Sequence, residues 1–410
     1  MTRKSRKKSD RRGKNKKQRA SEKPKMVIGA PSPHDFKRVA HVEVDPASSL
    51  GFKGLPTEWK ELLKASGISK ERVLQENQQV LKALEFATGK FGNNKVPLLT
   101  AEQLQRTMAR KAPVQQKNPS LLYKKIEKLG EGAGGIVFKI EDKKSKEISA
   151  VKISPKAELQ YIETEIAIHA MSKHKNIVNY KATYLWKQEV WIVMDLVDGG
   201  CLTDFLGENC PDPWSESCIA YVMANSLEAL AYMHNKHLLH RDIKSDNILV
   251  GKDGTVKLAD FGFAVGLTSE KNKTKSTVGT PFWMAPEVIE GREYDSRCDI
   301  WSLGITAIEL VNDEPPHMDK TTLEALLDII TLPAPKPKRD EICSNEFLDF
   351  LDKALKKDYT KRLLAHELLQ HAFLQKSSTE KDFSEWIKYV IEEGGEERIV
   401  TNKNMSDVSV

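Results

Sequence analysis

The sequence has few cysteines and no long hydrophobic run. It contains five Cys in 410 residues, an odd number without metal-ligand spacing, which argues against a disulfide framework and favours a reducing compartment. No apolar run approaches the ~18 residues that a membrane-spanning helix requires. The basic N-terminus has no apolar stretch behind it, so it lacks the pattern of a secretory signal. We therefore expect a cytoplasmic protein, and its hydrophobic content of 40% supports a sizeable core.

The charge of the chain is unevenly distributed. Residues 1–25 contain 13 Lys and Arg against two acidic residues, a net charge of +11, whereas the rest of the chain carries −5. This segment is almost devoid of apolar residues and should be disordered. Such a tail suits anionic phospholipids, which we favour over nucleic acid, a nuclear address or a merely solvated tail. We expect recruitment to the plasma membrane or the cytoskeleton.

The most informative stretch, residues 240–262, carries the motifs H-R-D-x-K-x-x-N and D-F-G. Two short apolar runs separated by a turn-rich segment predict an antiparallel hairpin over residues 248–258. The two ends of a hairpin lie side by side, so Asn247 and Asp260 should meet, with Asp242 one short loop away. A converging amide and carboxylate can hold Mg²⁺, which prefers oxygen ligands and substrate phosphates. Asp242 is then free to accept a proton from a hydroxyl group.

Together these motifs resemble the catalytic core of eukaryotic protein kinases. The resemblance implies that Asp242 orients and deprotonates the substrate hydroxyl and that Lys244 stabilises the transferring phosphoryl group. Asn247 and Asp260 would hold the two Mg²⁺ ions that accompany ATP. The implied fold is α+β and has two lobes, a small one built mainly of strands and a large one built mainly of helices.

Further motifs of this family lie upstream. The pattern G-x-G-x-x-G-x-V over residues 130–137 lets backbone amides approach a triphosphate. Lys152 would reach the α- and β-phosphates, and Glu165, on a helix expected from about 159 to 173, would pair with it; Glu163 is the rival candidate. The ATP-binding residues that the resemblance implies are Gly130, Glu131, Gly132, Ala133, Gly134, Gly135, Val137, Ala150, Lys152, Glu165, Met194, Asp195, Val197 and Leu249.

The segment after the D-F-G motif has the serine/threonine-kinase pattern. Thr280, which precedes a proline, belongs to that pattern. A phosphate in the segment could pair with Arg241 and order the loop. Ungapped alignment puts Ser276 at the family's phosphothreonine position, whereas Thr277 is the chemically matching residue, which we slightly favour.

Three other residues are expected to be structural, and one is unusual. The resemblance implies that Glu287 and Arg362 form a buried ion pair and that Asp299 ties its helix to the catalytic loop. His169 occupies a position where relatives carry an apolar residue that packs toward Phe261. A histidine there would be tolerated, weaken the active arrangement or make it sensitive to pH.

Residues 26–45 are expected to be extended, since they combine two prolines with several β-branched residues. An extended segment suits edge-on addition to another protein's sheet. The segment resembles a GTPase-binding motif of the Cdc42/Rac-interactive type, which implies a small GTPase of the Rac/Cdc42 type in its GTP form as partner. Gly29, Arg38 and Glu43 depart from the pattern and leave the choice of GTPase open. The matching positions are Ile28, Pro31, Phe36, His41 and Val42.

The stretch that follows resembles the inhibitory switch segment of PAK-family kinases. Thr57 is expected to cap a first helix, in which Leu62 and Leu63 share an apolar face. Ser69 is expected to cap a second helix that continues to Leu84. In the family, such a segment packs on the kinase until a GTPase pulls it away. The alternative is a helical hairpin that is merely docked on the large domain.

Taken together, these motifs resemble those of PAK-family serine/threonine protein kinases of the STE group. The resemblance implies a Rho-family-GTPase-activated enzyme that transfers the ATP γ-phosphate to protein Ser/Thr in cytoskeletal or signalling control. The alternatives are a GTPase-binding pseudokinase scaffold and, from the tail alone, a nucleic-acid binder. The predicted segments are a basic tail (1–25), the GTPase-binding motif and switch (26–86), a linker (87–122), the kinase domain (123–374) and a C-terminal helix and tail (375–410).

Overall fold

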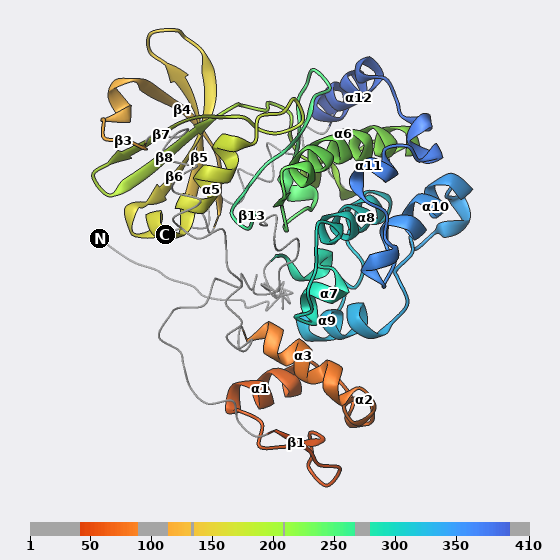
Figure 1. The fold of residues 1–410 in the computed structure, drawn as a ribbon. Helices are drawn as coiled ribbons and strands as arrows, with labels where there is room; N and C mark the ends of the chain where they lie inside the picture. The colour runs from red at the N-terminus through yellow and green to blue at the C-terminus, as the bar shows by residue number, and fades with distance from the viewer. Residues whose placement is uncertain (1–41, 89–113, 133–134, 208–209, 267–278, 394–410) are drawn as a thin grey trace, which may run out of the picture.

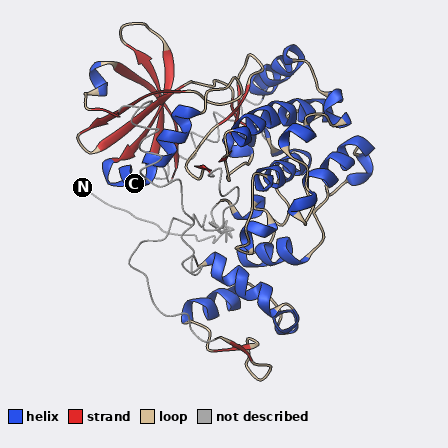
Figure 2. Ribbon diagram, in the orientation of Figure 1, coloured by secondary structure: helices blue, strands red, loops and turns tan. Residues whose placement is uncertain are grey.

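The computed structural model of the chain describes residues 42–88, 114–132, 135–207, 210–266 and 279–393. These residues form a lobe built on a β-sheet, a larger lobe of helices, and a small helical module that lies against the large lobe (Figures 1 and 2). The predicted two-lobed α+β fold is confirmed. None of the helices in these ranges combines the length and apolar character that a membrane crossing needs.

The small lobe is a six-stranded sheet with the strand order β3-β7-β8-β6-β5-β4. Side chains alternate across it, as the two-residue period of a strand requires. On β8, Trp191 and Val193 enter the core on one face, while Val190 and Ile192 pack with Ile166 of helix α5 on the other. The elements are β3 (Val114–Gln115), η1 (Pro119–Leu121), β4 (Tyr123–Gly132), β5 (Gly135–Asp142), β6 (Ile148–Pro155), η2 (Lys156–Glu158), α5 (Leu159–Met171), β7 (Tyr180–Trp186) and β8 (Glu189–Met194).

The sheet begins earlier in the chain than the sequence predicts. Val114 and Gln115 form strand β3, which pairs in parallel with Thr183 and Tyr184 of β7. The segment predicted as a linker up to residue 122 thus contributes a strand to the sheet near its C-terminal end. A two-residue strand has no periodicity to detect, and its pairing partner lies about 70 residues downstream.

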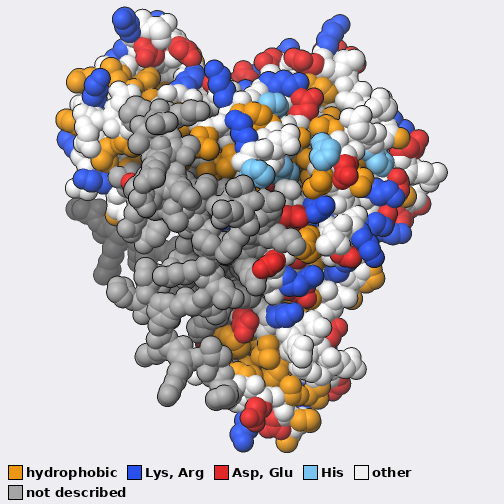
Figure 3. Space-filling model, viewed as in Figure 1, with side chains coloured by type: hydrophobic (Ala, Val, Ile, Leu, Met, Phe, Trp, Pro, Cys, Tyr) orange, Lys and Arg blue, Asp and Glu red, His pale blue; other side chains and the backbone are white. Residues whose placement is uncertain are grey.

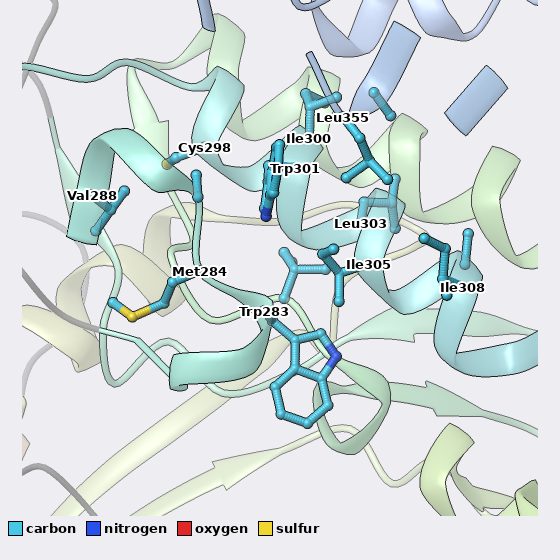
Figure 4. Packing of buried hydrophobic residues seen from close by; sticks show 14 of the residues in the cluster. Trp283, Met284, Val288, Cys298, Ile300, Trp301, Leu303, Ile305, Ile308 and Leu355 are labelled. Atoms are coloured by element: carbon cyan, nitrogen blue, oxygen red, sulfur yellow. The ribbon is translucent and has the colours of Figure 1, made fainter. Parts of the chain in front are cut away.

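The large lobe is built around helix α8, whose residues Cys298 to Leu310 are all buried. Figure 4 shows Trp301 and its neighbours on α8, together with Trp283 and Met284, which precede α7. The helices are α6 (Glu216–Asn235), α7 (Pro286–Ile289), α8 (Arg297–Asn312), α9 (Thr322–Thr331), α10 (Asn345–Ala354), α11 (Ala365–Leu368) and α12 (Glu380–Glu393). Short elements are β9 (Gly200–Cys201), η3 (Leu202–Phe205), β10 (Leu238–Leu239), η5 (Ser245–Asn247), β11 (Ile248–Val250), β12 (Val256–Leu258), β13 (Val265–Gly266), η6 (Pro281–Trp283), η7 (Asp340–Ile342), η8 (Tyr359–Lys361) and η9 (Ala372–Lys376).

The N-terminal module differs from its predicted form at two points. Pro56, not Thr57, is the N-cap residue of the first helix, and it makes no side-chain cap. The predicted second helix is interrupted at Glu76, where the Asn77 side chain donates to the carbonyl of Leu74 (2.9 Å), because Asn competes for helical carbonyls. The predicted Ser69 cap is confirmed. The module consists of β1 (Glu43–Val44), β2 (Phe52–Lys53), α1 (Thr57–Ala65), α2 (Lys70–Gln75) and α3 (Asn77–Ala87).

Helix α12 closes the far side of the large lobe, next to α6 (Figure 1). Phe383, Ile387 and Val390 are buried along one of its faces, so the predicted C-terminal helix packs on the large lobe. The Ser384 hydroxyl donates to the carbonyl of Lys252, in the turn between β11 and β12 (2.7 Å).

Candidate active site

The predicted hairpin is confirmed and brings its two ends together. Strands β11 and β12 pair antiparallel, with Ile248 opposite Leu258. The amide of Ala259 donates to the carbonyl of Asn247 (2.9 Å), which places Asp260 beside Asn247. Asp260 has a positive φ of 59°, a conformation unusual for a non-glycine residue. Its Oδ1 accepts from the amide of Gly262 (3.0 Å), which helps to hold it there.

Asp242 is buried beside this hairpin. The Asn247 side-chain amide donates to both the carbonyl oxygen and Oδ2 of Asp242, at 2.8 Å each. The Thr280 hydroxyl donates to Asp242 Oδ1 (2.7 Å) and accepts from Lys244 Nζ (2.9 Å). A hydroxyl therefore already lies against Asp242 with an ammonium group beside it, which is the arrangement that proton transfer from an alcohol needs.

Helix α8 fixes the loop that carries Asp242 through the side chain of Asp299. The fully buried carboxylate of Asp299 accepts from the amides of His240 (3.0 Å) and Arg241 (2.7 Å) and from the His234 ring (2.8 Å). Although burial opposes the ionisation of Asp299, His234 and His240 lower its pKa. The predicted link between Asp299 and the catalytic loop is thus present.

Lys152 joins the two lobes of the site. Its Nζ lies 2.8 Å from Glu165 Oε1 and 3.6 Å from Asp260 Oδ1. Burial disfavours the charge of Lys152, but Asp260 and Glu165 outweigh it and raise its pKa. Conversely, the charge of Lys152 lowers the pKa of Asp260. Glu165 is therefore the partner of Lys152, whereas Glu163, the rival, is exposed.

The glycine-rich loop and the strands beside it surround the nucleotide position. Gly135 has φ +126°, and a Cβ there would lie 2.3 Å from the carbonyl oxygen of Ile153, so only glycine fits. Val137 pairs with Lys152 across the sheet, and Ala150 pairs with Met194. The predicted residues Gly130, Glu131, Gly132, Asp195, Val197 and Leu249 also lie in the described β4, β11 and the segment after β8.

Several predicted residues lie outside the described part of the chain. They are Ala133 and Gly134 of the glycine-rich loop, Ser276 and Thr277 of the activation segment, and Ile28, Pro31, Phe36 and His41 of the GTPase-binding motif. The basic tail and most of the linker are also outside it. Val42 is described; it is partly buried and packs against the hydrophobic cluster that the module shares with the large lobe.

A buried polar cluster beneath the site was not predicted. Glu309 of α8 accepts from the Ser245 hydroxyl (2.6 Å) and from the Trp283 indole (2.9 Å). Ser245 also shares a hydrogen bond with Thr203 (2.7 Å). Burial raises the pKa of Glu309 to about 7. The cluster ties the catalytic loop to η6, but its members lie up to about 100 residues apart and share no motif.

The predicted ion pair between Glu287 and Arg362 is present, with both side chains fully buried. The guanidinium makes two bonds to the carboxylate, at 2.7 and 3.1 Å, and lies over the Trp301 ring. A buried pair that loses one partner leaves an uncompensated charge. This pair therefore anchors the segment after Thr280 to the core shown in Figure 4.

The donor set fits magnesium held jointly with a phosphate ligand. Asn247 and Asp260 together offer an amide oxygen and a carboxylate, and the Asp260 side chain is 49% exposed. Within the described ranges no three His, Cys, Asp or Glu side chains cluster closely enough to form a metal site by themselves. Mg²⁺ is commonly held by one or two protein ligands and completes its shell with water and phosphate oxygens.

The N-terminal module docks on the helices of the large lobe that follow Thr280. Helix α3 packs on α9 and α7 (Figure 1). Arg72 Nη2 lies 2.7 Å from Asp328 Oδ1 and 3.3 Å from the Thr331 hydroxyl. Lys82 lies 3.5 Å from Glu290. The sequence gives no sign of these contacts, because the partners lie more than 200 residues apart.

Asp328 is the most buried charge at this contact, with a side chain 1% exposed. Besides Arg72 it contacts Lys320, and His317 Nδ1 lies 3.6 Å away. Although burial opposes the ionisation of Asp328, Lys320 and Arg72 lower its pKa. The carboxylate is thus shared between the large lobe and the module.

The two predicted apolar positions of α1 have different environments. Leu63 is 2% exposed in the module core, whereas Leu62 is only partly buried and lines a surface hollow of about 310 Å³ with Glu58, Glu61 and Ala65. At the lower end of the view in Figure 3, hydrophobic side chains gather on the surface of the module, with a few charged side chains beside them. Leu62 therefore does not share the buried environment of Leu63.

Both the N-terminal module and the two-lobed part of the chain are similar to known proteins. Residues 123–374 match the family described as Protein kinase domain, and residues 27–88 match P21-Rho-binding domain. The serine/threonine-protein kinase pakC of Dictyostelium discoideum is 40% identical over 363 residues, which cover 87% of this chain and 75% of that protein. The serine/threonine-protein kinase pakA of the same organism is 37% identical over 86% of this chain and 30% of its own length. The serine/threonine-protein kinase PAK 1 of Mus musculus is 45% identical over 63% of this chain and 47% of its own length.

Proposed function

The chain belongs to the PAK family of serine/threonine protein kinases, and from that premise we propose how it transfers phosphate and how its module restrains it. Family membership implies ATP, protein substrates and a small GTPase as partners. The pseudokinase alternative receives no support. The observation that carries the proposal is a complete catalytic arrangement in a chain whose GTPase-binding module is docked on the large lobe.

In the proposed reaction, Asp242 accepts the proton of the substrate hydroxyl. The Thr280 hydroxyl, 2.7 Å from Asp242 Oδ1, lies where a substrate hydroxyl would be received. Lys244 lies 3.4 Å from Asp242 Oδ2 and supplies positive charge close to the transferring group. Electrostatic stabilisation and positioning provide most of the catalysis in phosphoryl transfer.

Lys152 and the hairpin would hold the nucleotide. Lys152, fixed by Glu165, orients the α- and β-phosphates. Asn247 and Asp260 would hold two Mg²⁺ ions, which neutralise the phosphate charge and polarise the γ-phosphoryl group when bound. Replacing Asp242 by Asn should keep ATP binding and abolish nearly all transfer to a generic basic protein. More than a few per cent residual turnover with unaltered ATP affinity would contradict this role.

We further propose that the docked module is inhibitory and acts from the substrate side. The Lys152–Glu165 and Asp242–Thr280 contacts are intact while the module is docked, so the nucleotide site stays assembled. The module instead contacts α9 and α7, and α9 packs against η6, which directly follows Thr280. Docking would therefore hinder protein substrates and leave the affinity for ATP unchanged.

A Rac/Cdc42-type GTPase in its GTP form would release the module by competition. In the docked state, Glu43 and Val44 pair with Lys53 and Phe52, and Phe52 is buried in the module core. Addition of the neighbouring segment to a GTPase sheet would recruit the same residues. The two states would then exclude each other, and the GTPase shifts the balance by its preference for the released state.

The basic tail would bring the kinase from the cytoplasm to an anionic membrane surface. Its net charge of +11 over residues 1–25 corresponds to about 1 kcal/mol of attraction per basic residue near such a surface. Recruitment of this kind would place the GTPase-binding motif, which directly follows the tail, beside a membrane-attached partner.

A further inference from the structure

The turn that joins β11 to β12 lies against the C-terminal helix α12. The Ser384 hydroxyl of α12 donates to the carbonyl of Lys252 in this turn (2.7 Å). Gly254, two residues further along, has a φ of +90°, and a Cβ there would lie 2.5 Å from the carbonyl oxygen of Glu380. That oxygen belongs to the backbone and cannot rotate aside as a flexible side chain can. Only glycine therefore allows the turn and the helix to approach each other this closely.

Helix α6 holds the same turn from a second side. The Tyr221 hydroxyl of α6 donates to the carbonyl of Gly254 (3.1 Å). The Tyr221 ring also packs on Phe383 of α12, with the ring centroids 4.7 Å apart, and Phe383 is fully buried. Because α6 and α12 are themselves in contact (Figure 1), the turn rests on two helices that are packed together.

A third side of the hairpin faces the segment that follows β8. Strand β9 pairs antiparallel with β11, which places Leu249 opposite Cys201. The Lys252 amide donates to the side chain of Asp198 (3.0 Å). The three-stranded sheet β12-β11-β9 thus carries a predicted nucleotide contact, Leu249, on its middle strand and the two predicted metal ligands at the base of its hairpin.

We propose that α12 is a positioning element for the nucleotide site, which fixes the tip of the hairpin and so sets where Leu249, Asn247 and Asp260 lie. The hairpin strands have three residues each, a length of about 10 Å, so a displacement of the tip reaches the base. The proposal rests on the nucleotide- and metal-holding roles assigned above to these residues. It gives a function to residues 380–393, which lie beyond the match to the kinase-domain family at 123–374.

Two contacts of α12 are distinct from its packing on the core. Its apolar face, formed by Phe383, Ile387 and Val390, is sufficient to attach the helix to the large lobe. The Ser384 hydrogen bond and the close approach of Gly254 are directed at the hairpin instead. Substitutions at these two residues therefore test the positioning role and leave the apolar face intact.

Gly254→Ala in the full chain tests the close approach, and Gly207→Ala is its matched control. Both glycines have a positive φ, +90° and +61°, so both substitutions strain the backbone, but nothing lies within 4 Å of a Cβ at Gly207. We expect the KM for ATP to rise about tenfold in Gly254→Ala, because the turn must move away from α12. In Gly207→Ala it should stay within about twofold, and the KM for the protein substrate should be unchanged in both chains.

Ser384→Ala removes one hydrogen bond without adding an atom, and it carries the test if Gly254→Ala does not fold. We expect the KM for ATP and the Mg²⁺ concentration that gives half the maximal rate to rise about fivefold. Ser378→Ala, whose hydroxyl bonds only the carbonyl of the adjacent Thr379, should change neither by more than about twofold. A merely structural loss would lower kcat and leave the Mg²⁺ midpoint in place. Equal Mg²⁺ midpoints in Ser384→Ala and Ser378→Ala would overturn the proposal.

Hydrogen exchange in the absence of nucleotide gives a readout that needs no catalysis. The amides of residues 248–258 should exchange about fivefold faster in Ser384→Ala than in the unaltered chain, and at an unchanged rate in Ser378→Ala. Unchanged exchange in Ser384→Ala would overturn the anchor, and faster exchange with an unaltered KM for ATP would overturn its role in nucleotide binding. If the unaltered chain bound no ATP, the proposed function would fail, whereas the exchange rates would still decide whether α12 holds the hairpin.

Discussion

Reversing the charge of Arg72 should release the module from the large lobe. The Asp328 carboxylate is 1% exposed and the Arg72 side chain is 29% exposed, with 2.7 Å between them. Breaking a buried ion pair costs about 3–5 kcal/mol, whereas exposed pairs contribute about 0–1 kcal/mol. Because Arg72 is partly exposed and Lys320 remains beside Asp328, we expect the Arg72→Glu change to cost about 2 kcal/mol.

That cost translates into a measurable change in activity. At 1.36 kcal/mol per factor of ten, it shifts the ratio of released to docked chains about thirtyfold. If about 1% of the chains are released before the substitution, about 23% are released after it. Basal phosphorylation of a generic basic protein by the full chain should therefore rise roughly twentyfold, with an unaltered KM for ATP.

Lys64→Glu is the matched control for this experiment. Lys64 lies on α1, is exposed, and undergoes the same change of charge. The basal activity of the Lys64→Glu chain should stay within about twofold of that of the unaltered chain, because exposed charges contribute little to the stability of the docked state. If Arg72→Glu leaves basal activity unchanged while the module remains folded, the Arg72–Asp328 contact does not restrain the kinase.

Three further predictions concern the module, the lobe junction and the tail. Leu63→Asp should strongly activate the full chain, because it buries a charge in the module. Leu62→Asp, beside the surface hollow, should activate it only weakly. Equal activation by the two substitutions in phosphorylation assays would contradict these different environments. The folded-state pKa of His169, about 4, lies below its ordinary value of 6.5, so the neutral ring stabilises the fold fully above pH 6.5 and loses that effect as the pH falls toward 4. Between pH 7 and pH 5 the unfolding free energy of the unaltered chain should therefore drop by about 2 kcal/mol more than that of His169→Met. An identical drop in the two chains would refute this. Residues 1–25 should bind vesicles only when these contain anionic lipid, with binding that weakens steeply as salt rises; equal binding to neutral vesicles in a sedimentation assay would exclude the electrostatic account.

The catalytic centre could be predicted because its parts are close in sequence. Asn247 and Asp260 belong to one hairpin, and the turn between its strands dictates that they meet. The pairing of Lys152 with Glu165 joins residues 13 positions apart. For the hairpin, local structure restricts where the side chains can lie. For Lys152, spacing left Glu163 as a rival, and the structure decides for Glu165.

The features that the sequence did not reveal depend on long-range packing or on local competition. The Arg72–Asp328 contact joins residues 256 positions apart, and the Glu309 cluster draws on three separate segments. Strand β3 is defined only by its partner on β7. The break at Glu76 arises because the Asn77 side chain bonds a helical carbonyl, an outcome that apolar periodicity cannot indicate.

The most direct measurement is the rate at which the full chain phosphorylates a generic basic protein with GTP-loaded or GDP-loaded Rac-type GTPase. A chain that lacks residues 1–99 but retains β3 provides the reference for the released kinase. The account predicts a low rate for the full chain, unchanged by the GDP form and raised by the GTP form to nearly that of the reference. An equally low rate in the shortened chain, or no response to the GTP form, would contradict it.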